Sequence, residues 1–583
     1  MEVKVAGYNI DAEIIEEVKR QLTQIRNKLG PSDMQPEDHD ELVKTIWSEA
    51  ALFLEKTEFT PETISASYAR ISRYPQSIPE LRKIAREEVK KARRSNKAII
   101  FDMGHFSVAE HAVFNFDILG LSRFAVEELE KGRLDSYTEK SQRYITLDGD
   151  FVTPKEFKGS DLELYLETVE KQNKMYFKAY PKARTYFMEQ NKEQFGNAFD
   201  PIMEVLNTTW TPDPLTNSKL IRKSLKQISG LEKKPSEYKK IIDRIDGFAK
   251  EDARYALSMG IEAQIGCTIN ARNLEYRIRQ LKHSKLAEHR ELGQKLFELT
   301  KEIAPSLILL TDPEEFKEAT GRELKEDWLK QGKENIKKAT QELIEKYGLP
   351  GHEQGRKLKD PKDCVRFIER TTRPDDLIID ALIQINSNVS CSDAHELAYR
   401  QATYDDKVEY IKKCLQNLSE FDRLPREFEE STMTFEAIMS SSCFAQMKRH
   451  RMMTLLPQDY DPSLGYTIPE SIKAIRMEQE FIDLFAETSK AFYKLKENNP
   501  DAANYVLTNA HRRRVRITSN VRELYHIARL REDAHAQWDI QNISKEIIKL
   551  AKTKAPITMM LACGKDKFYD LKKEVYGNES KQS

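Results

Sequence analysis

Cysteine is scarce in this chain, and its cysteines are never closely spaced. The six are Cys267, Cys364, Cys391, Cys414, Cys443 and Cys563. No two of them form a Cys-x-x-Cys pair, which argues against a structural zinc site and against a disulfide framework. The pattern is typical of a protein from a reducing compartment. We therefore predict a cytoplasmic protein without a metal site.

Long apolar runs and net charge are missing as well. No stretch approaches the ~18 uncharged apolar residues of a membrane span, and the N-terminus, MEVKVAGYNIDAEIIEEV, lacks the apolar core of a signal peptide. The 94 Lys and Arg residues balance 95 Asp and Glu residues, which leaves a formal charge of -1. Without a basic excess there is no general attraction for a phosphate backbone. We expect neither a membrane nor a nucleic acid as partner.

What the sequence does contain is helical periodicity over most of its 583 residues. Apolar residues recur at helical spacing over 11–29, 37–55, 79–94, 161–190, 274–304, 314–346, 405–419, 470–496 and 523–554. Strand-like alternation is clearest in HAVFNFDIL (111–119) and STMTFEAIM (431–439). A mostly helical chain with a few strands predicts an α+β fold.

Two patterns occur twice along the chain. NARNLEYRIRQL (270–281) is similar to NVRELYHIARLR (520–531), and FNFDILGLSRFAVEELEKGR (114–133) has the character of MTFEAIMSSSCFAQMKRHR (433–451). In the first copy, more residues separate the segment 114–133 from the segment 270–281 than separate the corresponding segments, 433–451 and 520–531, in the second copy. This difference predicts an insertion near 185–250. We predict a first half, 1–346, with added N-terminal helices and a C-terminal helical extension, and a second half, 362–583. The Gly-, Pro- and charge-rich stretch YGLPGHEQGRKLKDP (347–361) is the predicted linker.

Three short stretches could bind anions. SYTEKSQRY (136–144) brings hydroxyls and the guanidinium of Arg143 within eight residues, a set that suits a phosphate monoester. KRHR (448–451) and HRRRVR (511–516) are basic clusters. For each of them the alternative is a solvated loop or a solvated helix face, and for HRRRVR we favour that alternative.

Taken together, these segments resemble a known family. GHFSVAEHAVFNF (104–116), SYTEKSQRY (136–144) and the Asn-Ala-Arg and Asn-Val-Arg segments at 270 and 520 are similar to those of the flavin-dependent thymidylate synthases. That family carries Gly-His-x-Ser-x-x-Glu-His, then Arg-His-Arg leading to Ser-x-Arg-Tyr, then Ala-Arg-x-x-Leu-Pro and Asn-Ala-Arg. The resemblance covers about 80–165, 250–310 and 420–556. It implies a tandem duplication of one synthase unit, each unit mostly helical with a small antiparallel or mixed sheet.

The resemblance also implies an activity and its ligands. The family methylates dUMP reductively to dTMP, with FAD as cofactor, methylene-tetrahydrofolate as one-carbon donor and NADPH or NADH as reductant. Its members are homotetramers whose sites lie between subunits. Two tandem chains would supply four such units, so the resemblance implies a homodimer.

Site residues are implied position by position. The catalytic residue would be Arg531, a fixed cation that stabilises negative charge developing on the uracil ring. Substrate contacts would come from Gln446, Arg449, Glu139, Ser141, Arg143 and Arg254. Cofactor contacts would come from His105, Ser107, Glu139, Arg449, His450, Arg451, Asn520 and Arg522.

Neither half carries the complete set. The first half has Lys131-Gly132-Arg133 in place of Arg-His-Arg and Leu281 in place of the uracil-contacting arginine. In the second half, the Ser and Arg positions of the substrate loop are Asp459 and Asp461, and the position of Arg254 is Asn504.

Because the two sets of losses are complementary, we hypothesise one composite pocket built from both halves. The alternative is a repurposed or non-catalytic protein that binds flavin or a nucleotide and acts on another pyrimidine nucleotide or on nucleic acid.

Overall fold

The computed structural model describes residues 1–28, 36–141, 150–209, 223, 225–226, 233–349 and 361–577. The chain forms two compact units. Unit 1 comprises Met1–Lys140, Asp150–Phe157 and Gly260–Gly351, and unit 2 comprises Ser141–Gly149, Lys158–Met259 and His352–Ser583. Part of the first half of the sequence, Lys158–Met259, thus packs with the second half. The linker predicted at 347–361 lies mostly outside the described residues.

Each unit contains one four-stranded antiparallel sheet, which confirms the predicted α+β class. In unit 1 the strand order is β1 (Glu2–Tyr8), β2 (Val113–Ser122), β4 (Glu262–Asn270) and β3 (Ser136–Glu139). In unit 2 it is β5 (Val365–Arg370), β6 (Thr432–Ser440), β8 (Arg512–Asn520) and β7 (Thr454–Pro457). The order of corresponding strands is the same.

The two sheets also share their register. Ser136 faces Thr268 in unit 1, and the same two repeat positions, Thr454 and Thr518, face each other in unit 2. The difference is one bulge in β2 at Gly120, whose φ of 67° lies in the left-handed region that glycine adopts without strain. The repeat read from the sequence is therefore a repeat of structure.

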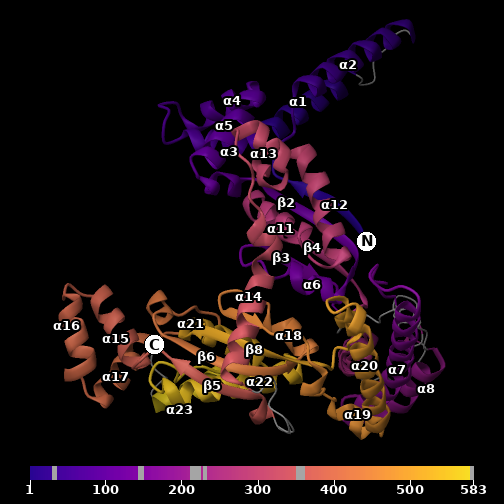
Figure 1. The fold of residues 1–583 in the computed structure, drawn as a ribbon, viewed down its shortest axis with the longest axis vertical. Helices are drawn as coiled ribbons and strands as arrows, with labels where there is room; N and C mark the ends of the chain where they lie inside the picture. Colours follow the sequence, from indigo (N-terminus) through magenta and orange to yellow (C-terminus); the bar gives the residue numbers. More distant parts are fainter. Residues whose placement is uncertain are drawn as a thin grey trace. The chain divides into compact units, whose positions relative to one another are not determined.

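The helices of unit 1 come from both sides of its strands in the sequence, and in Figure 1 the first two extend away from the sheet. The N-terminal ones are α1 (Ala12–Lys28), α2 (Pro36–Lys56), α3 (Glu62–Arg70), α4 (Ile78–Glu87) and α5 (Val89–Lys97). The later ones are α6 (Arg123–Leu129), α11 (Ala271–Lys282), α12 (Ala287–Ile303), α13 (Pro313–Thr320) and α14 (Asp327–Tyr347). Alternate residues of β2, Phe114, Phe116 and Ile118, are buried in one core with Leu274 and Ile278 of α11, as the pleat of a half-buried strand requires.

The helices described in unit 2 come from both halves of the sequence. Those from the first half of the sequence are α7 (Ser160–Gln190), α8 (Phe199–Thr209) and α10 (Pro235–Ala253). Those from the second half are α15 (Pro374–Ile385), α16 (Cys391–Glu396), α17 (Tyr404–Leu415), α18 (Ser441–Met447), α19 (Glu470–Ala474), α20 (Glu478–Asn498), α21 (Val521–Arg531), α22 (Trp538–Lys554) and α23 (Phe568–Tyr576). Helix α7 packs on both α10 and α20, and Figure 1 shows α7 and α20 side by side.

Polar caps fix where the helices of each repeat begin. Ser122 accepts a hydrogen bond from the Ala125 N–H at the start of α6, and Ser440 accepts one from Cys443 at the start of α18. Asn270 and Asn520 cap α11 and α21 in the same way. Such caps satisfy backbone N–H groups that the first helical turn leaves unpaired. None of the helices in the described part of the chain combines the length and the apolarity that a bilayer crossing needs.

Candidate active site

In unit 2, two copies of one segment face each other. Ser258, which follows α10, forms an antiparallel bridge with Thr508, which precedes β8. The Asn509 N–H donates to the Leu257 carbonyl (2.9 Å), and the Met259 N–H donates to the Leu507 carbonyl (2.7 Å). Ser258 and Thr508 hold the same position in the sequence repeat, so the two halves of the chain meet here through equivalent residues.

Asn509 joins this bridge to the start of α18. Its side-chain amide donates to the Arg254 carbonyl (3.1 Å), and its own carbonyl accepts from the Ser442 N–H (3.0 Å). Arg254 Nη2 in turn donates to Ser442 Oγ (2.7 Å). A buried guanidinium from the first half is thereby held at the first turn of a helix from the second half.

A chain of buried polar side chains runs behind this turn. Ser440 Oγ and the Tyr255 hydroxyl (2.9 Å) both donate to Asp539 Oδ2. Gln537 Nε2 donates to the Tyr255 oxygen (2.7 Å), and Gln446 Nε2 donates to Gln537 Oε1 (2.9 Å). Burial raises the pKa of the Asp539 carboxyl, and the hydroxyls of Ser440 and Tyr255 oppose that rise. We refer to Asp539, Tyr255, Gln537 and Gln446 as the relay.

A second buried carboxyl, that of Asp252, is connected to the relay through Trp538. Asp252, at the end of α10, accepts hydrogen bonds from Ser471 Oγ and from Trp538 Nε1 (2.8 Å). The Trp538 ring stacks on Tyr255 with ring centroids 5.6 Å apart. Burial raises the pKa of Asp252 to about 7. The residues on either side of Arg254 are thus fixed by side chains from the second half.

Arg531 and His450 form a directed pair at the other end of α18. Arg531 Nε donates to His450 Nε2 (2.8 Å), and Arg531 Nη2 donates to the Gln446 carbonyl (3.1 Å). Burial, with the charge of Arg531, lowers the pKa of His450 to about 3. Its Nε2 can therefore accept, and the proton sits on Nδ1, 3.3 Å from Glu523 Oε1. In the KRHR cluster, His450 is not a cation but a neutral support for Arg531.

The other cofactor residues predicted in unit 2 have varied surroundings. Arg449 is exposed and Arg451 half-buried, directly after α18. Asn520 caps α21, and Arg522 donates to the Leu424 carbonyl (2.6 Å) and pairs with Glu429 (2.5 Å). Unit 1 repeats the latter pair as Arg272 with Glu110 (2.5 Å). Asn520 and Arg522 thus hold the fold together, and their contact with flavin stays a prediction.

Of the remaining predicted residues, His105, Ser107 and Glu139 belong to unit 1, and Ser141 and Arg143 belong to the segment Ser141–Gly149 assigned to unit 2. His105 and Ser107 are exposed at the start of the short helix Phe106–His111. Glu139 ends β3, and its carboxylate is 4.0 Å from Nε of the buried Arg123. Ser141 ends a described range, and Arg143 lies outside the described residues. Their roles in substrate and cofactor binding stay predictions.

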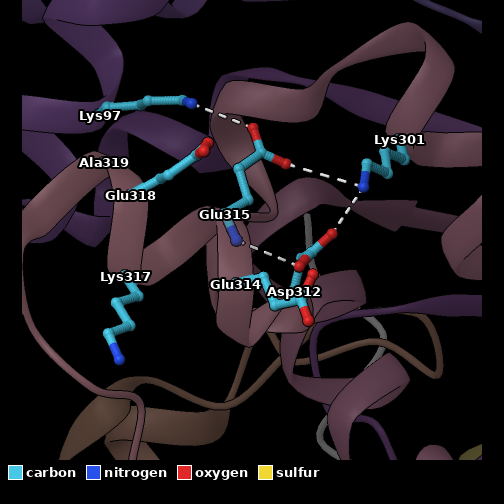
Figure 2. A pocket seen from close by; sticks show the side chains of 8 residues that line it. All are labelled: Lys97, Lys301, Asp312, Glu314, Glu315, Lys317, Glu318 and Ala319. Atoms are coloured by element: carbon cyan, nitrogen blue, oxygen red, sulfur yellow. Dashed lines mark hydrogen bonds and ion pairs between the residues drawn. The ribbon is translucent and has the colours of Figure 1, made fainter.

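A large hollow of unit 1 lies elsewhere. It has a volume of about 850 Å³ and includes Lys97, Lys301, Asp312 and Glu315 among its lining residues. Figure 2 shows Lys97 and Lys301 turned toward Glu315, with Lys301 also paired to Asp312. These charges pair with one another, and none of the predicted site residues lines the hollow. Within the described residues, no group of three or more His, Cys, Asp or Glu side chains is placed to hold a metal ion.

Four residues of the site were not predicted from the sequence: Tyr255, Ser442, Gln537 and Asp539. Two signals could have pointed to three of them. Tyr255 and Ser442 lie next to, or one helical turn from, the predicted residues Arg254 and Gln446. Gln537 belongs to the Ala-Gln-Trp triplet that follows Arg531. Tyr255 is hydrogen-bonded to Asp539, 284 positions away, and to Gln537, 282 positions away, and Ser442 is hydrogen-bonded to Arg254, 188 positions away; no local pattern reports such contacts.

Comparison with known proteins adds independent information. The family model described as thymidylate synthase complementing protein (Thy1) matches residues 54–306 and 366–557. A flavin-dependent thymidylate synthase of Clostridium tetani is 28% identical over 262 residues, 44% of this chain and 85% of that protein. One of Geobacter sulfurreducens is 27% identical over 251 residues, 42% of this chain and 81% of that protein.

Two further similarities differ in extent. UPF0159 protein Ta1429 of Thermoplasma acidophilum is 22% identical over 502 residues, 84% of this chain and 93% of that protein, so the similarity runs through both halves. A solved structure that resembles part of this chain is the crystal structure of a UMP/dUMP methylase PolB from Streptomyces cacaoi, bound with 5-Br dUMP, and the sequence of that protein is 16% identical to this chain. It covers 34% of this chain and 95% of that chain with a TM-score of 0.26, which is too low to carry an argument.

Proposed function

Because the chain belongs to the thymidylate synthase complementing protein family, we propose that it is an FAD-dependent enzyme that methylates dUMP to dTMP. The one-carbon donor is methylene-tetrahydrofolate and the reductant NADPH or NADH. The family and its curated relatives support the general class, a flavoprotein of the thymidylate synthase type. The particular substrates, and a working assembly of two chains, are part of the proposal.

The observation that carries the proposal is the hydrogen bond between Arg254 and Ser442. Arg254 lies in the first matched segment and Ser442 in the second, and their side chains meet in unit 2 at 2.7 Å. Gln446, one turn after Ser442, is hydrogen-bonded through its backbone to Arg531. The arginines expected on the two sides of a shared nucleotide site are therefore tied to the same short helix, α18. This supports a composite site with residues from both halves.

The chain's own residues suit the chemistry. Bound flavin supplies hydride transfer, and the protein supplies orientation and charge. Arg531 is held at Nε and Nη2, so its guanidinium is pre-oriented and can stabilise negative charge that develops on a uracil ring. Arg254, with Ser141 and Arg143, would hold the nucleotide phosphate. Arg449 and Arg451, which follow α18, would hold the anionic part of FAD.

The proposal is tested on the purified full-length chain. We expect flavin absorbance, or uptake of added FAD, and formation of dTMP from dUMP, methylene-tetrahydrofolate and NADPH, measured by mass spectrometry. Flavin and nucleotide binding without any dTMP would favour the repurposed binding protein. A chain that binds no flavin would overturn the proposal.

Matched variants test the composite site. Arg254→Ala should abolish dUMP binding, whereas Asn504→Ala, at the same repeat position of the second half, should leave it unchanged. Arg531→Ala and Leu281→Ala form a second such pair. If Asn504→Ala and Arg254→Ala weakened dUMP binding equally, the composite site would be wrong.

A further inference from the structure

We propose that the relay fixes the side-chain amide of Gln446, so that the site selects a nucleotide that donates a hydrogen to Gln446 Oε1. Tyr255, Gln537 and Asp539 are then positioning residues, and Gln446 is the residue that reads the ligand. This inference rests on the proposed function, because it assumes that the site binds a pyrimidine nucleotide.

The direction of each hydrogen bond in the relay follows from its chemistry. Asp539 Oδ2 receives the hydroxyl hydrogens of Ser440 and Tyr255. Since the Tyr255 hydroxyl has spent its one hydrogen there, its oxygen must accept from Gln537, which turns Gln537 Nε2 toward Tyr255. Gln537 then presents Oε1 to Gln446. The amide of Gln446 must meet this oxygen with its NH2 group.

A second acceptor imposes the same orientation. Gln446 Nε2 also lies 3.4 Å from the Ser442 carbonyl, one turn earlier in α18. A backbone carbonyl can only accept, whatever the charge of Asp539. Two acceptors therefore hold the NH2 group, and a flipped amide would place Oε1 against both of them.

This orientation of the amide leaves Gln446 Oε1 as an acceptor without a hydrogen-bond donor among the described residues. Gln446 is only 9% exposed, and its Oε1 is buried without a hydrogen-bond partner among the described residues. Leaving a buried acceptor unpaired costs about 1–3 kcal/mol. A ligand N–H or O–H at this point recovers that free energy, whereas a ligand acceptor there faces like partial charge.

The neighbours of Gln446 indicate which groups of a ligand would lie close to Gln446 Oε1. Its backbone carbonyl accepts from Arg531, and Arg254 binds Ser442 one turn away. A nucleotide bound by both arginines lies along this turn of α18. On dUMP two groups can donate, the imide N3–H of uracil and the 3′-hydroxyl of the sugar. In dCMP, N3 carries no hydrogen and can only accept.

The test compares three ligands on the FAD-loaded full-length chain by isothermal titration: dUMP, dCMP and 2′,3′-dideoxyuridine monophosphate. If N3–H is the donor, dCMP should bind about tenfold to a hundredfold more weakly than dUMP. If the 3′-hydroxyl is the donor, the dideoxynucleotide should show that loss instead. Either result supports the inference. Equal affinity for all three ligands would overturn it and leave the proposed function standing.

Variants then test the relay itself. Tyr255→Phe and Gln537→Met interrupt it at two points and leave only the 3.4 Å contact with the Ser442 carbonyl to orient the Gln446 amide. The affinity difference should therefore shrink by about threefold or more, while FAD binding is kept. Tyr505→Phe removes the hydroxyl at the same repeat position of the second half and should keep the full difference. Thermal unfolding midpoints confirm that each variant is folded.

Two other results would contradict the inference that the relay orients Gln446. If both Tyr255→Phe and Gln537→Met discriminate like the unmodified chain, the relay does not orient Gln446. A chain that binds FAD but none of the three nucleotides would overturn the inference together with its premise.

Discussion

Acid should loosen the turn that joins the two halves in unit 2, because His511 is buried there in its neutral form. The ring is fully buried. Nδ1 lies 3.1 Å from the Thr508 N–H, a group that can only donate. Nε2 lies 3.3 Å from Ser489 Oγ, whose own hydrogen goes to the Phe485 carbonyl. Nδ1 must therefore accept and Nε2 carries the proton, so a second proton has no place.

The magnitude follows from the pKa. Burial lowers the pKa of His511 to about 3, against about 6.5 for histidine in an unfolded chain. Below pH 6.5 the unfolded chain binds a proton that the folded chain refuses, so the free energy of unfolding falls as the pH drops from 6.5 toward 3. At pH 5 this amounts to about 2 kcal/mol, at 1.36 kcal/mol per pH unit. Above pH 6.5 the contribution is complete.

The change that removes this titration is His511→Asn, in which the amide oxygen can take the place of Nδ1. We expect the variant to be less stable at pH 7.5, because packing is lost. Between pH 7.5 and 5.0, however, its free energy of unfolding should fall by about 2 kcal/mol less than that of the unmodified chain. Hydrogen exchange in urea, read by mass spectrometry on the peptides of β6 and β8, reports unit 2 separately from unit 1.

A control and a refuting outcome complete this test. His105→Asn changes an exposed histidine of unit 1, so the loss of stability on acidification read on the β6 and β8 peptides of unit 2 should match that of the unmodified chain. If His511→Asn loses as much stability on acidification as the unmodified chain, the neutral, buried state assigned to His511 is wrong.

Three further changes have expected results. Arg254→Leu should weaken dUMP binding at least about tenfold in titration calorimetry, because a charged hydrogen bond is worth about 1.5–3 kcal/mol. Arg531→Lys keeps the charge but loses the planar geometry that meets His450 and the Gln446 carbonyl, so kcat for dTMP formation should fall more than dUMP affinity. Ser440→Ala removes the cap of α18 and also a hydrogen-bond donor to the buried Asp539 carboxyl, so it should lower the free energy of unfolding by at least about 2 kcal/mol, measured by urea denaturation.

The strands show what the sequence could and could not predict. Of the strands in the described part of the chain, the two predicted ones, β2 and β6, are central and rich in β-branched and aromatic residues. Strand β8 was missed because it begins with the basic run predicted to be a solvated face. In the structure, Arg514 pairs with Glu436 on one side of the strand. Arg513, on the other side, is buried over the rings of Phe444 (4.6 Å) and Tyr460 (4.1 Å).

Helix boundaries failed for a different reason. The periodicity over 274–304 predicts one helix, but the structure has α11 and α12 with a reversal between them. Both helices present an apolar face to the same core, so the pattern continues across the turn. Gly293 marks the contact, since a Cβ there would lie 2.8 Å from that of Leu281. Only the close approach of the two helices shows the reversal.

The sequence predicted those residues of the site that belong to short family motifs. Gln446, Arg531 and Arg254 each belong to a short motif of the family and were named from the sequence. What holds them could not be named, because the supporting contacts join distant segments. The bond from Arg254 to Ser442 depends on how the halves pair, and that pairing is set by the bridge between Ser258 and Thr508.

The same repeat positions have been used differently in the two copies, which argues for one site per chain. In unit 2, His450 fills the space under Arg531. At the equivalent place in unit 1 stands Gly132, where a Cβ would lie 1.8 Å from Asp135 Oδ2. Asp135 is itself buried and accepts from the Tyr137 hydroxyl (3.0 Å). In unit 1, therefore, the room for a histidine is already occupied by hydrogen-bonded groups. Restoring single family residues to the first copy would not rebuild a site, because other packed and hydrogen-bonded groups occupy the space that their side chains need.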